Sequence, residues 1–250
     1  MFDKLFSPET IEETLRILQT EIPLACWETV YVTVLATAFA VILGLPLGVL
    51  LVVGEKDGVR PLPKGVMHVL NVIINLLRSV PFLILMIMVF PLTRLIVGTA
   101  VGTVASIVPL VIAAFPFVAR LVEGSLREVN PNIIEMAQSM GASPFQIIVK
   151  VLIPESVPSL ISNFTIAITT ILGYSAMSGI IGGGGLGKIA INYGYNRYNY
   201  AVMLIATILI VILVTIFQAL GSYLANRMDH RITKTTPKSK KHHPEKAGFQ

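Results

Sequence analysis

The sequence predicts an all-α integral membrane protein with about five transmembrane helices. Two observations support this fold class. Hydrophobic residues make up 54% of the 250 residues and charged residues only 13%, whereas a soluble domain carries roughly 25% charged residues. The apolar residues are also collected in long runs, as is typical of helices that cross a bilayer.

Five apolar segments are long enough to cross a membrane, and polar segments separate them. A membrane-spanning helix needs about 20 predominantly apolar residues. The predicted spans cover about residues 27–53, 66–90, 99–122, 157–181 and 200–224. We therefore expect a single transmembrane domain over residues 27–228.

The ends and interiors of these segments carry residues typical of membrane helices. Trp27 and Tyr31 begin the first span, where aromatic side chains suit the membrane interface. Gly44 and Gly48 lie about one turn apart in the same span, so a neighbouring helix can approach closely there. Pro91 follows the second span and is expected to end it.

Two segments flank the transmembrane domain. Residues 1–26 are expected to form an amphipathic lead-in at the membrane surface, because Ile11, Leu15 and Leu18 share one helical face. Residues 229–250 are rich in Lys, Pro and His and are expected to be a disordered basic tail.

The distribution of Lys and Arg predicts the orientation of the chain. Basic residues concentrate in the segments 54–65 and 123–155 and in the tail, and short basic loops stay in the cytoplasm. The N-terminus is therefore expected outside and the C-terminus inside, which requires an odd number of spans. Five helices are few for enclosing a solute path, so we expect a dimer around a two-fold axis.

Several other function classes find no support in the sequence. The single cysteine, Cys26, excludes an intrachain disulfide, and no metal-binding or catalytic constellation is present. Nucleic-acid binding is not expected, because the basic residues are not interleaved with aromatics. Residues 182–188 resemble the start of a phosphate-binding loop, but Ile189 stands where Ser or Thr must hold magnesium. We interpret these glycines as a close-packed bend.

The segment 130–154 predicts two short, well-capped helices between the third and fourth spans. Asn130 and Ser143 are suited to cap the two helices, and Pro131 and Pro144 to begin them. Gly141 can adopt the left-handed conformation that ends the first helix, and Gln146 can complete a capping box with Ser143. Two capped helices at an angle would make a rigid knob on the cytoplasmic face.

These residues resemble the EAA loop of ABC importer permeases. Glu135, Met136 and Ala137, then Gly141, and finally Ile153 before Pro154 follow the pattern of that loop, with Met136 in place of its middle alanine. In the family this loop forms the coupling helix that docks on the ATP-hydrolysing subunit. An ordinary helical loop is the alternative. The residues expected to contact the ATPase are Glu135, Met136, Ala137, Gly141, Ala142, Ser143, Pro144 and Pro154.

A wider set of motifs resembles the permeases of methionine-import ABC transporters. The motifs lie at residues 78–82, 107–110, 114–120, 173–177 and 184–187. The resemblance implies a bacterial inner-membrane complex that contains a second copy of this chain, two ATP-binding cassette subunits and an extracytoplasmic methionine-binding lipoprotein. It also implies that this chain is no enzyme and holds no cofactor, since ATP and magnesium bind to the partner ATPase.

The fourth predicted span carries the most polar side chains and is the candidate solute path. Asn163, Thr170, Tyr174 and Met177, together with the flanking Ser178, are the candidate lining residues. Asn163 and Thr170 suit interhelical hydrogen bonding equally well, whereas Tyr174, Met177 and Ser178 favour a pathway or gate.

Arg78 is expected well inside the second span, since it lies about a dozen residues into the predicted helix. A buried arginine is a functional candidate, either to hydrogen-bond carbonyls freed around Pro81 or to attract a carboxylate solute. Two alternatives to a methionine importer stay open. One is a permease for another small amino acid or related solute, and the other is a non-transport membrane subunit or a membrane enzyme.

Overall fold

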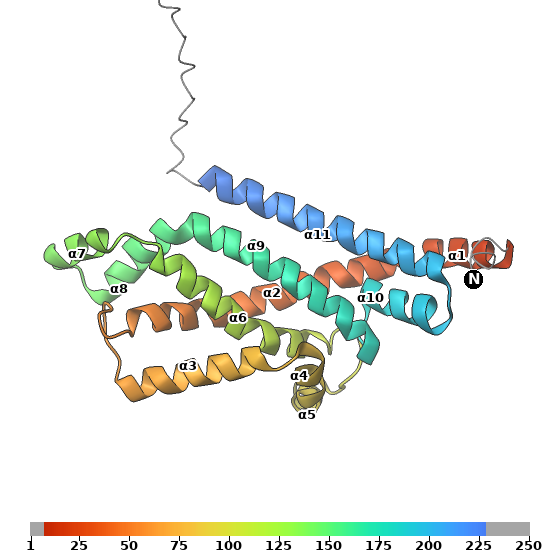
Figure 1. Cartoon of the computed structure of the whole chain (residues 1–250), viewed down its shortest axis with the longest axis horizontal. Coiled ribbons are helices and arrows are strands. Elements are labelled where there is room, and N and C mark those ends of the chain that lie inside the picture. Colours follow the sequence, from red (N-terminus) through yellow and green to blue (C-terminus); the bar gives the residue numbers. More distant parts are fainter. Residues whose placement is uncertain (1–7, 229–250) are drawn as a thin grey trace, which may run out of the picture.

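The computed structural model describes residues 8–228 and is helical almost throughout. The basic tail at 229–250 and the first seven residues of the lead-in lie outside the described residues. Figure 1 shows the long helices side by side along one axis, with α7 and α8 at one end and α1 and α10 at the other. The helices are α1 (Pro8–Thr20), α2 (Ile22–Val53), α3 (Lys64–Ser79), α4 (Phe82–Met88), α5 (Phe90–Val97), α6 (Ile107–Arg127), α7 (Pro131–Ser139), α8 (Pro144–Ile147), α9 (Ile153–Ser178), α10 (Gly185–Ile189) and α11 (Tyr200–Met228).

Four helical segments within the described residues are long and apolar enough to cross a membrane. They are α2, α6, the continuous stretch Pro144–Ile181 and α11. A fifth crossing exists if α3 and α4 are counted as one bent span. The prediction of about five transmembrane helices in an all-helical protein therefore agrees with four to five candidate spans.

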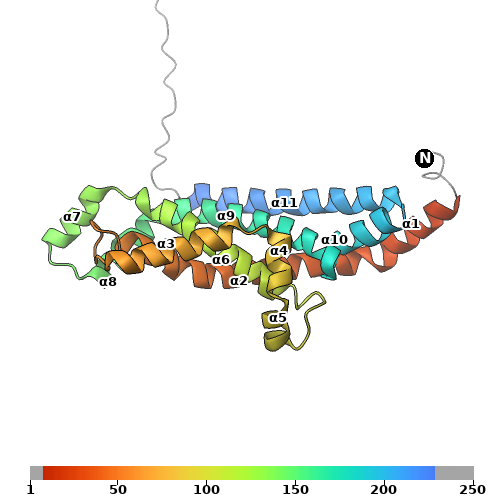
Figure 2. The ribbon, with the colours of Figure 1, turned by 60° about the horizontal axis from the view of Figure 1, so that its bottom comes forward.

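The second predicted span, residues 66–90, is wrong as a single straight helix. α3 and α4 meet at an angle of 106°. The residue before a proline is disfavoured in the helical conformation, and Val80 is extended (φ −75°, ψ 126°) ahead of Pro81. Pro91 was expected to end this span, but it lies in the first turn of α5, where a missing N–H costs nothing. Figure 2 shows α4 and α5 projecting away from the long helices.

The third predicted span, residues 99–122, is displaced along the chain. α6 begins only at Ile107 and runs on to Arg127, so Arg120 and Glu123 lie inside a helix. Proline does not interrupt α6, because Pro109 lies in its first turn and the interior Pro116 is tolerated in a helix packed among others.

The fourth predicted span begins earlier than expected. α8 was expected to be a separate short helix, but it continues through a π-helical turn, Ile148–Leu152, into α9. Pro154 consequently does not separate the loop from the span. The π-helical turn ends two residues before Pro154 and shifts the hydrogen-bonding pattern there, so the helix continues through this proline.

The core lies where α2 crosses α6. A Cβ atom on Gly44 would meet Val118 Cγ1 at 2.8 Å, and one on Gly48 would meet Val122 Cβ at 2.6 Å. The close helix approach predicted from this glycine pair is therefore confirmed. Ala36, Ala40, Leu110 and Ala114 fill the adjoining part of the core.

The lead-in helix α1 joins α2 almost without a break, since Glu21 alone separates them. Ile17 is buried with Ile22, Leu186 and Val202 in a second, smaller apolar cluster. The predicted apolar face of Ile11, Leu15 and Leu18 is exposed.

Candidate functional site

The knob formed by α7 and α8 is capped as the sequence predicts. Asn130 Oδ1 accepts a hydrogen bond from the Asn132 amide at 3.0 Å. At the other end of α7, Gly141 adopts φ +79°. The Gly141 amide donates to the Gln138 carbonyl at 2.9 Å and the Ala142 amide to the Ala137 carbonyl at 3.1 Å, which is the Schellman pattern.

α8 begins with a complete capping box. The Ser143 amide donates to Gln146 Oε1 at 2.8 Å, and the Gln146 amide donates to Ser143 Oγ at 3.4 Å. Both terminal amides are thereby satisfied without help from another element. The capping motifs at both ends of the α7–α8 turn hold the two helices at a defined angle.

The knob exposes large apolar side chains. Met140 is 80% exposed and Phe145 is 73% exposed, and Met136 is exposed beside them. Exposed apolar residues gathered on one projection are typical of a protein interaction site. Ala137, by contrast, packs into the core and anchors α7 to the bundle.

The remaining predicted loop residues lie on the same projection. Glu135, Gly141, Ser143 and Pro144 are exposed, and Ala142 is partly buried. Pro154 is exposed but lies in the first turn of α9, beyond the knob. Glu135 also lines a cavity of about 370 Å³ with Gln138, Arg127 and Glu55.

A network of charged and polar side chains lies behind the knob and was not predicted. Arg120 and Arg127 of α6 both bond to Glu123, and Arg120 also bonds to Asn71 and Asn75 of α3. The sequence signal was present, because the residues 120, 123 and 127 are spaced at one helical turn. The predicted span ends at residue 122, which places Glu123 and Arg127 in a loop and Arg120 at its edge.

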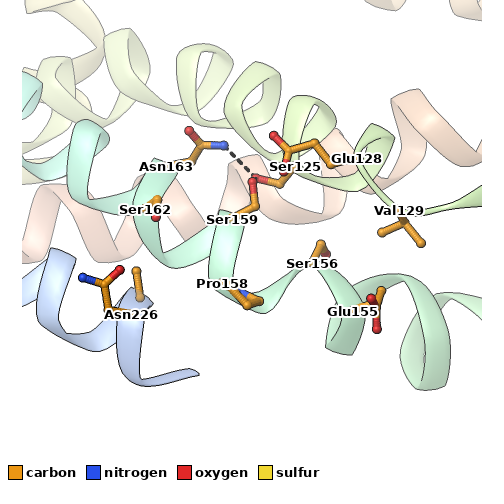
Figure 3. Close-up of a pocket in the computed structure, with 11 residues that line it drawn as sticks. Ser125, Glu128, Val129, Glu155, Ser156, Pro158, Ser159, Ser162, Asn163 and Asn226 are labelled. Atoms are coloured by element: carbon orange, nitrogen blue, oxygen red, sulfur yellow. Dashed lines mark hydrogen bonds between the residues drawn. The ribbon is translucent and has the colours of Figure 1, made fainter. Parts of the chain in front are cut away.

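The predicted lining residues of α9 do not share one environment. Asn163 turns toward α6, where its Nδ2 donates to Ser125 Oγ at 2.7 Å and to the Leu121 carbonyl at 3.2 Å. Figure 3 shows this bond at the edge of a polar cavity of about 370 Å³ between α6, α9 and the end of α11. Among residues 8–228, Thr170 hydrogen-bonds only within its own helix, to the Ile166 carbonyl at 2.8 Å.

Tyr174 and Met177 lie further along α9, near the α10 end. The Tyr174 ring is stacked on Phe82 of α4, with centroids 4.7 Å apart and planes 6° apart. Ser178 is buried and donates to the Ser175 carbonyl. Met177 is 47% exposed. It belongs to an exposed stripe that contains Ser162, Ile166 and Gly173 of α9 and continues to Ile180 in the short 3₁₀ turn after α9.

Arg78 is not buried, contrary to the expectation. It lies one residue before the end of α3 and is exposed. Within residues 8–228 it makes no hydrogen bond or ion pair, so the carbonyls near Pro81 are not its partners. The physical reason is the bend at Val80, which turns the chain away and leaves Arg78 at a helix end.

The glycine-rich bend is close-packed, as interpreted from the sequence. A Cβ on Gly187 would lie 2.1 Å from the Ala176 carbonyl oxygen. The Gly185 amide donates to Glu28 Oε2 at 2.7 Å, and Thr103 donates to Glu28 Oε1 at 3.0 Å. The Glu28 carboxylate therefore occupies the Gly185 amide, which a phosphate bound to this loop would have to contact.

Glu28 is a site residue that the sequence pattern did not predict. It ties the bend to α2 and to the loop before α6, while Thr29 accepts from the Leu186 amide at 2.9 Å. The available signal was an isolated acid at the edge of an apolar span.

A second polar group lies at the same end of the bundle. The Tyr193 hydroxyl donates to the Glu21 carboxylate, and the Arg197 guanidinium lies 4.5 Å from the centroid of the Tyr193 ring. The hydrogen bond to Glu21, together with burial, raises the pKa of the Tyr193 phenol. No group of three His, Cys, Asp or Glu side chains within residues 8–228 is placed to hold a metal ion.

Comparisons of the chain with a protein-family model and with known proteins point to the same kind of protein. A family model for "Binding-protein-dependent transport system inner membrane component" matches residues 44–230. The chain is 49% identical over 208 residues to the probable D-methionine transport system permease protein MetI of Vibrio cholerae, covering 83% of this chain and 92% of that protein. It is 46% identical over 168 residues to the methionine import system permease protein MetP of Bacillus subtilis, covering 67% and 76% of the two chains.

The fold has a close counterpart among solved structures. A chain from the MetNI methionine ABC transporter in an inward-facing conformation superposes with a TM-score of 0.79 at 43% sequence identity. The match covers 81% of this chain and 93% of that chain.

Proposed function

The chain belongs to the family of binding-protein-dependent transport system inner membrane components, and on this premise we propose that it is the permease subunit of an ATP-driven methionine importer. The observation that carries the proposal is 49% identity to a methionine permease over 92% of that protein. The permease is a multi-pass protein of the bacterial inner membrane. ATP hydrolysis belongs to a partner subunit, and this chain supplies the path.

The α7–α8 knob is the proposed contact with that ATPase subunit. Its caps keep it rigid, and Met136, Met140 and Phe145 offer an apolar surface for a groove on the partner. A rigid projection transmits a displacement better than a flexible loop does. The α8 helix also continues into α9, so motion of the knob is carried directly along the helix that bears Tyr174 and Met177.

We place a second copy of the chain against the exposed stripe of α9. Four to five spans do not by themselves enclose a solute path, and this stripe combines Ser162 and Met177 with apolar surface. Two such stripes facing each other across a two-fold axis would form the path. Met177 would then lie at the axis, where a flexible thioether suits an adjustable gate.

The opposite end of the bundle is the proposed docking face for an extracytoplasmic methionine-binding lipoprotein. The glycine-rich bend is rigid there, because Glu28 and Thr29 hold its amides. ATP binding on the partner would move the knobs, and the two copies would alternate between inward-open and outward-open states.

The test is uptake of radiolabelled L- and D-methionine in a strain that lacks this gene. Wild-type gene should restore uptake, and Gly141→Asp should not, because it strains a φ of +79° and places a charge on the knob. Gly98→Asp is the matched control. Gly98 also has a positive φ (+86°) and open space around it, but it lies at the end of α5, away from the knob.

Restored uptake with Gly98→Asp but not with Gly141→Asp would support both the substrate and the coupling role. Unchanged methionine uptake in the deletion strain, with no second importer present, would overturn the methionine assignment. A permease for another small amino acid would then be the candidate, to be sought by a wider solute screen.

A further inference from the structure

A series of charged and polar side chains links three segments of the bundle behind the knob. It comprises Asn71, Asn75, Arg120, Glu123, Arg127 and Glu55, and we call it the arginine clamp. The clamp begins at the loop after α2, passes along α6 and ends on α3.

Glu123 is the centre of the clamp. Its Oε2 accepts from Arg120 Nη1 at 2.6 Å, and its Oε1 accepts from Arg127 Nη2 at 2.8 Å. Arg127 also pairs with Glu55 in the loop after α2. The Glu123 side chain is only 10% exposed and that of Arg120 only 20% exposed. Charges this deep are stable only when paired, so Arg120 and Glu123 hold each other in place, whereas Arg127 and Glu55 are about half exposed and form the outer part of the clamp.

Arg120 is the member that reaches α3. Its Nη2 contacts Asn71 Oδ1 at 2.7 Å and Asn75 Oδ1 at 3.0 Å, while its Nη1 stays on Glu123. A guanidinium can hold partners on separate nitrogens in one rigid plane, which a lysine ammonium cannot do.

α3 has little else to hold it to the bundle within the described residues. It packs mainly against α6, and Ile74 is its only buried residue. Its outward face is apolar and exposed, with Val66, Val69, Val72, Ile73 and Leu76. The polar contacts of Arg120 are therefore a principal tie between α3 and the rest of the molecule.

The far end of α3 leads to the proposed solute path. The chain bends at Val80 and enters α4, whose Phe82 is stacked on Tyr174 of α9. The clamp lies near the knob, because Arg127 and Glu55 line the same cavity as Glu135 and Gln138 of α7. α3 thus connects a contact near the knob with a contact near Met177.

We propose that Arg120 is a positioning residue for transport, which passes displacement of the knob from Arg127 and Glu123 to α3 and so to the Phe82–Tyr174 stack. The inference rests on the proposed function, because it requires an ATPase that moves the knob. Arg120 touches no solute in this role. It makes α3 move together with α6, so that ATP hydrolysis is accompanied by opening of the path.

The test uses the full complex with its ATPase subunits and binding protein, reconstituted in proteoliposomes. The double variant Asn71→Leu/Asn75→Leu removes the α3 arm and leaves the Arg120–Glu123 pair intact. We expect stimulated ATP hydrolysis near the wild-type rate, with methionine imported per ATP lowered about tenfold, the size of a typical coupling between sites. His68→Leu is the matched control, since His68 is an exposed polar residue of α3 outside the clamp.

Arg120→Lys provides a second variant with the charge retained. It is expected to lose coupling in the same way, because the single nitrogen of a lysine lies at one point and cannot replace the two separate nitrogens with which Arg120 reaches Glu123 and the asparagines. If Arg120→Lys fails to assemble, the double variant Asn71→Leu/Asn75→Leu still tests the role of Arg120.

Two results would overturn the inference. One is wild-type import per ATP in Asn71→Leu/Asn75→Leu. The other is a parallel loss of hydrolysis and import, which would show that the contacts of Arg120 with Asn71 and Asn75 only stabilise the fold. A wild-type complex that imports no methionine at all would instead contradict the proposed function, so the two failures are distinguishable.

Discussion

At the scale of single residues, glycine and proline decide where backbones meet and where helices bend. Gly44 and Gly48 let α2 approach α6, and Gly187 lets the glycine-rich bend lie against the Ala176 carbonyl. Pro81 forces Val80 out of the helical conformation and creates the elbow between α3 and α4. Pro116, by contrast, does not interrupt α6, so a proline breaks a helix in one place of this chain and is accommodated in another.

A methyl group on Gly187 should destabilise the complex. Gly187→Ala places a Cβ 2.1 Å from the Ala176 carbonyl oxygen, and overpacking of this kind typically costs about 1–3 kcal/mol. Gly124→Ala is the control, because nothing lies within 4 Å of its added Cβ on α6. Thermal unfolding midpoints in detergent should fall for Gly187→Ala alone, and equal midpoints would contradict the packing described here.

A larger side chain at Met177 should block the proposed path. Met177→Trp is expected to abolish methionine uptake while the complex still assembles, because the indole would occupy the space between two copies. Leu204→Trp is the control, since Leu204 is exposed on the apolar helix α11. Normal uptake by Met177→Trp would remove this residue from the pathway.

At the scale of elements, the α7–α8 knob is stiffened by the caps of its helices and by the continuous helix that joins α8 to α9. Its helices are short, yet both ends of the turn between them are satisfied by local hydrogen bonds. α8 then runs through a π-helical turn into α9 without a break, so the knob is an extension of a long membrane helix. The cap residues were predictable because they act within a few positions of one another.

Loss of the capping box should loosen the knob locally. Ser143→Ala removes an N-cap worth about 1 kcal/mol, which corresponds to roughly fivefold faster amide exchange over residues 143–147. Ser139→Ala should change exchange little, because the Ser139 hydroxyl bonds only to the Glu135 carbonyl within α7. Hydrogen exchange of the detergent-solubilised complex distinguishes them, and unchanged protection in Ser143→Ala would show that another contact holds α8.

At the scale of the whole molecule, the two ends of the bundle carry different polar groups. One end carries the knob and the arginine clamp, and the other carries the glycine-rich bend with Glu28 and the Tyr193–Glu21 pair. Figure 1 shows these ends separated by the length of the long helices. The distribution of Lys and Arg predicts that the knob end faces the cytoplasm.

This orientation can be tested with single cysteines in a Cys26→Ser background. Tyr195→Cys and Met140→Cys are suited to labelling because both side chains are largely exposed. Tyr195 follows α10 and Met140 lies between α7 and α8, and Figure 1 shows α10 and the α7–α8 pair at opposite ends. A membrane-impermeant maleimide added to intact cells with a permeable outer envelope should label Tyr195→Cys only. Met140→Cys should react only after the inner membrane is opened, and the reverse pattern would invert the proposed topology.

The sequence by itself determined the features that depend on local chemistry. Long apolar runs identified membrane helices, and Asn130, Gly141 and the Ser143–Gln146 pair specified the caps of the knob, because such bonds join neighbours along the chain. Only the tertiary structure decided what happens between distant segments. It turned Asn163 toward Ser125, stacked Tyr174 on Phe82, left Arg78 exposed at the end of α3 before the bend at Val80, and brought Arg120 to Asn71 and Asn75. Such pairings depend on where each helix begins, and a helix boundary shifted by five residues changes which side chains meet.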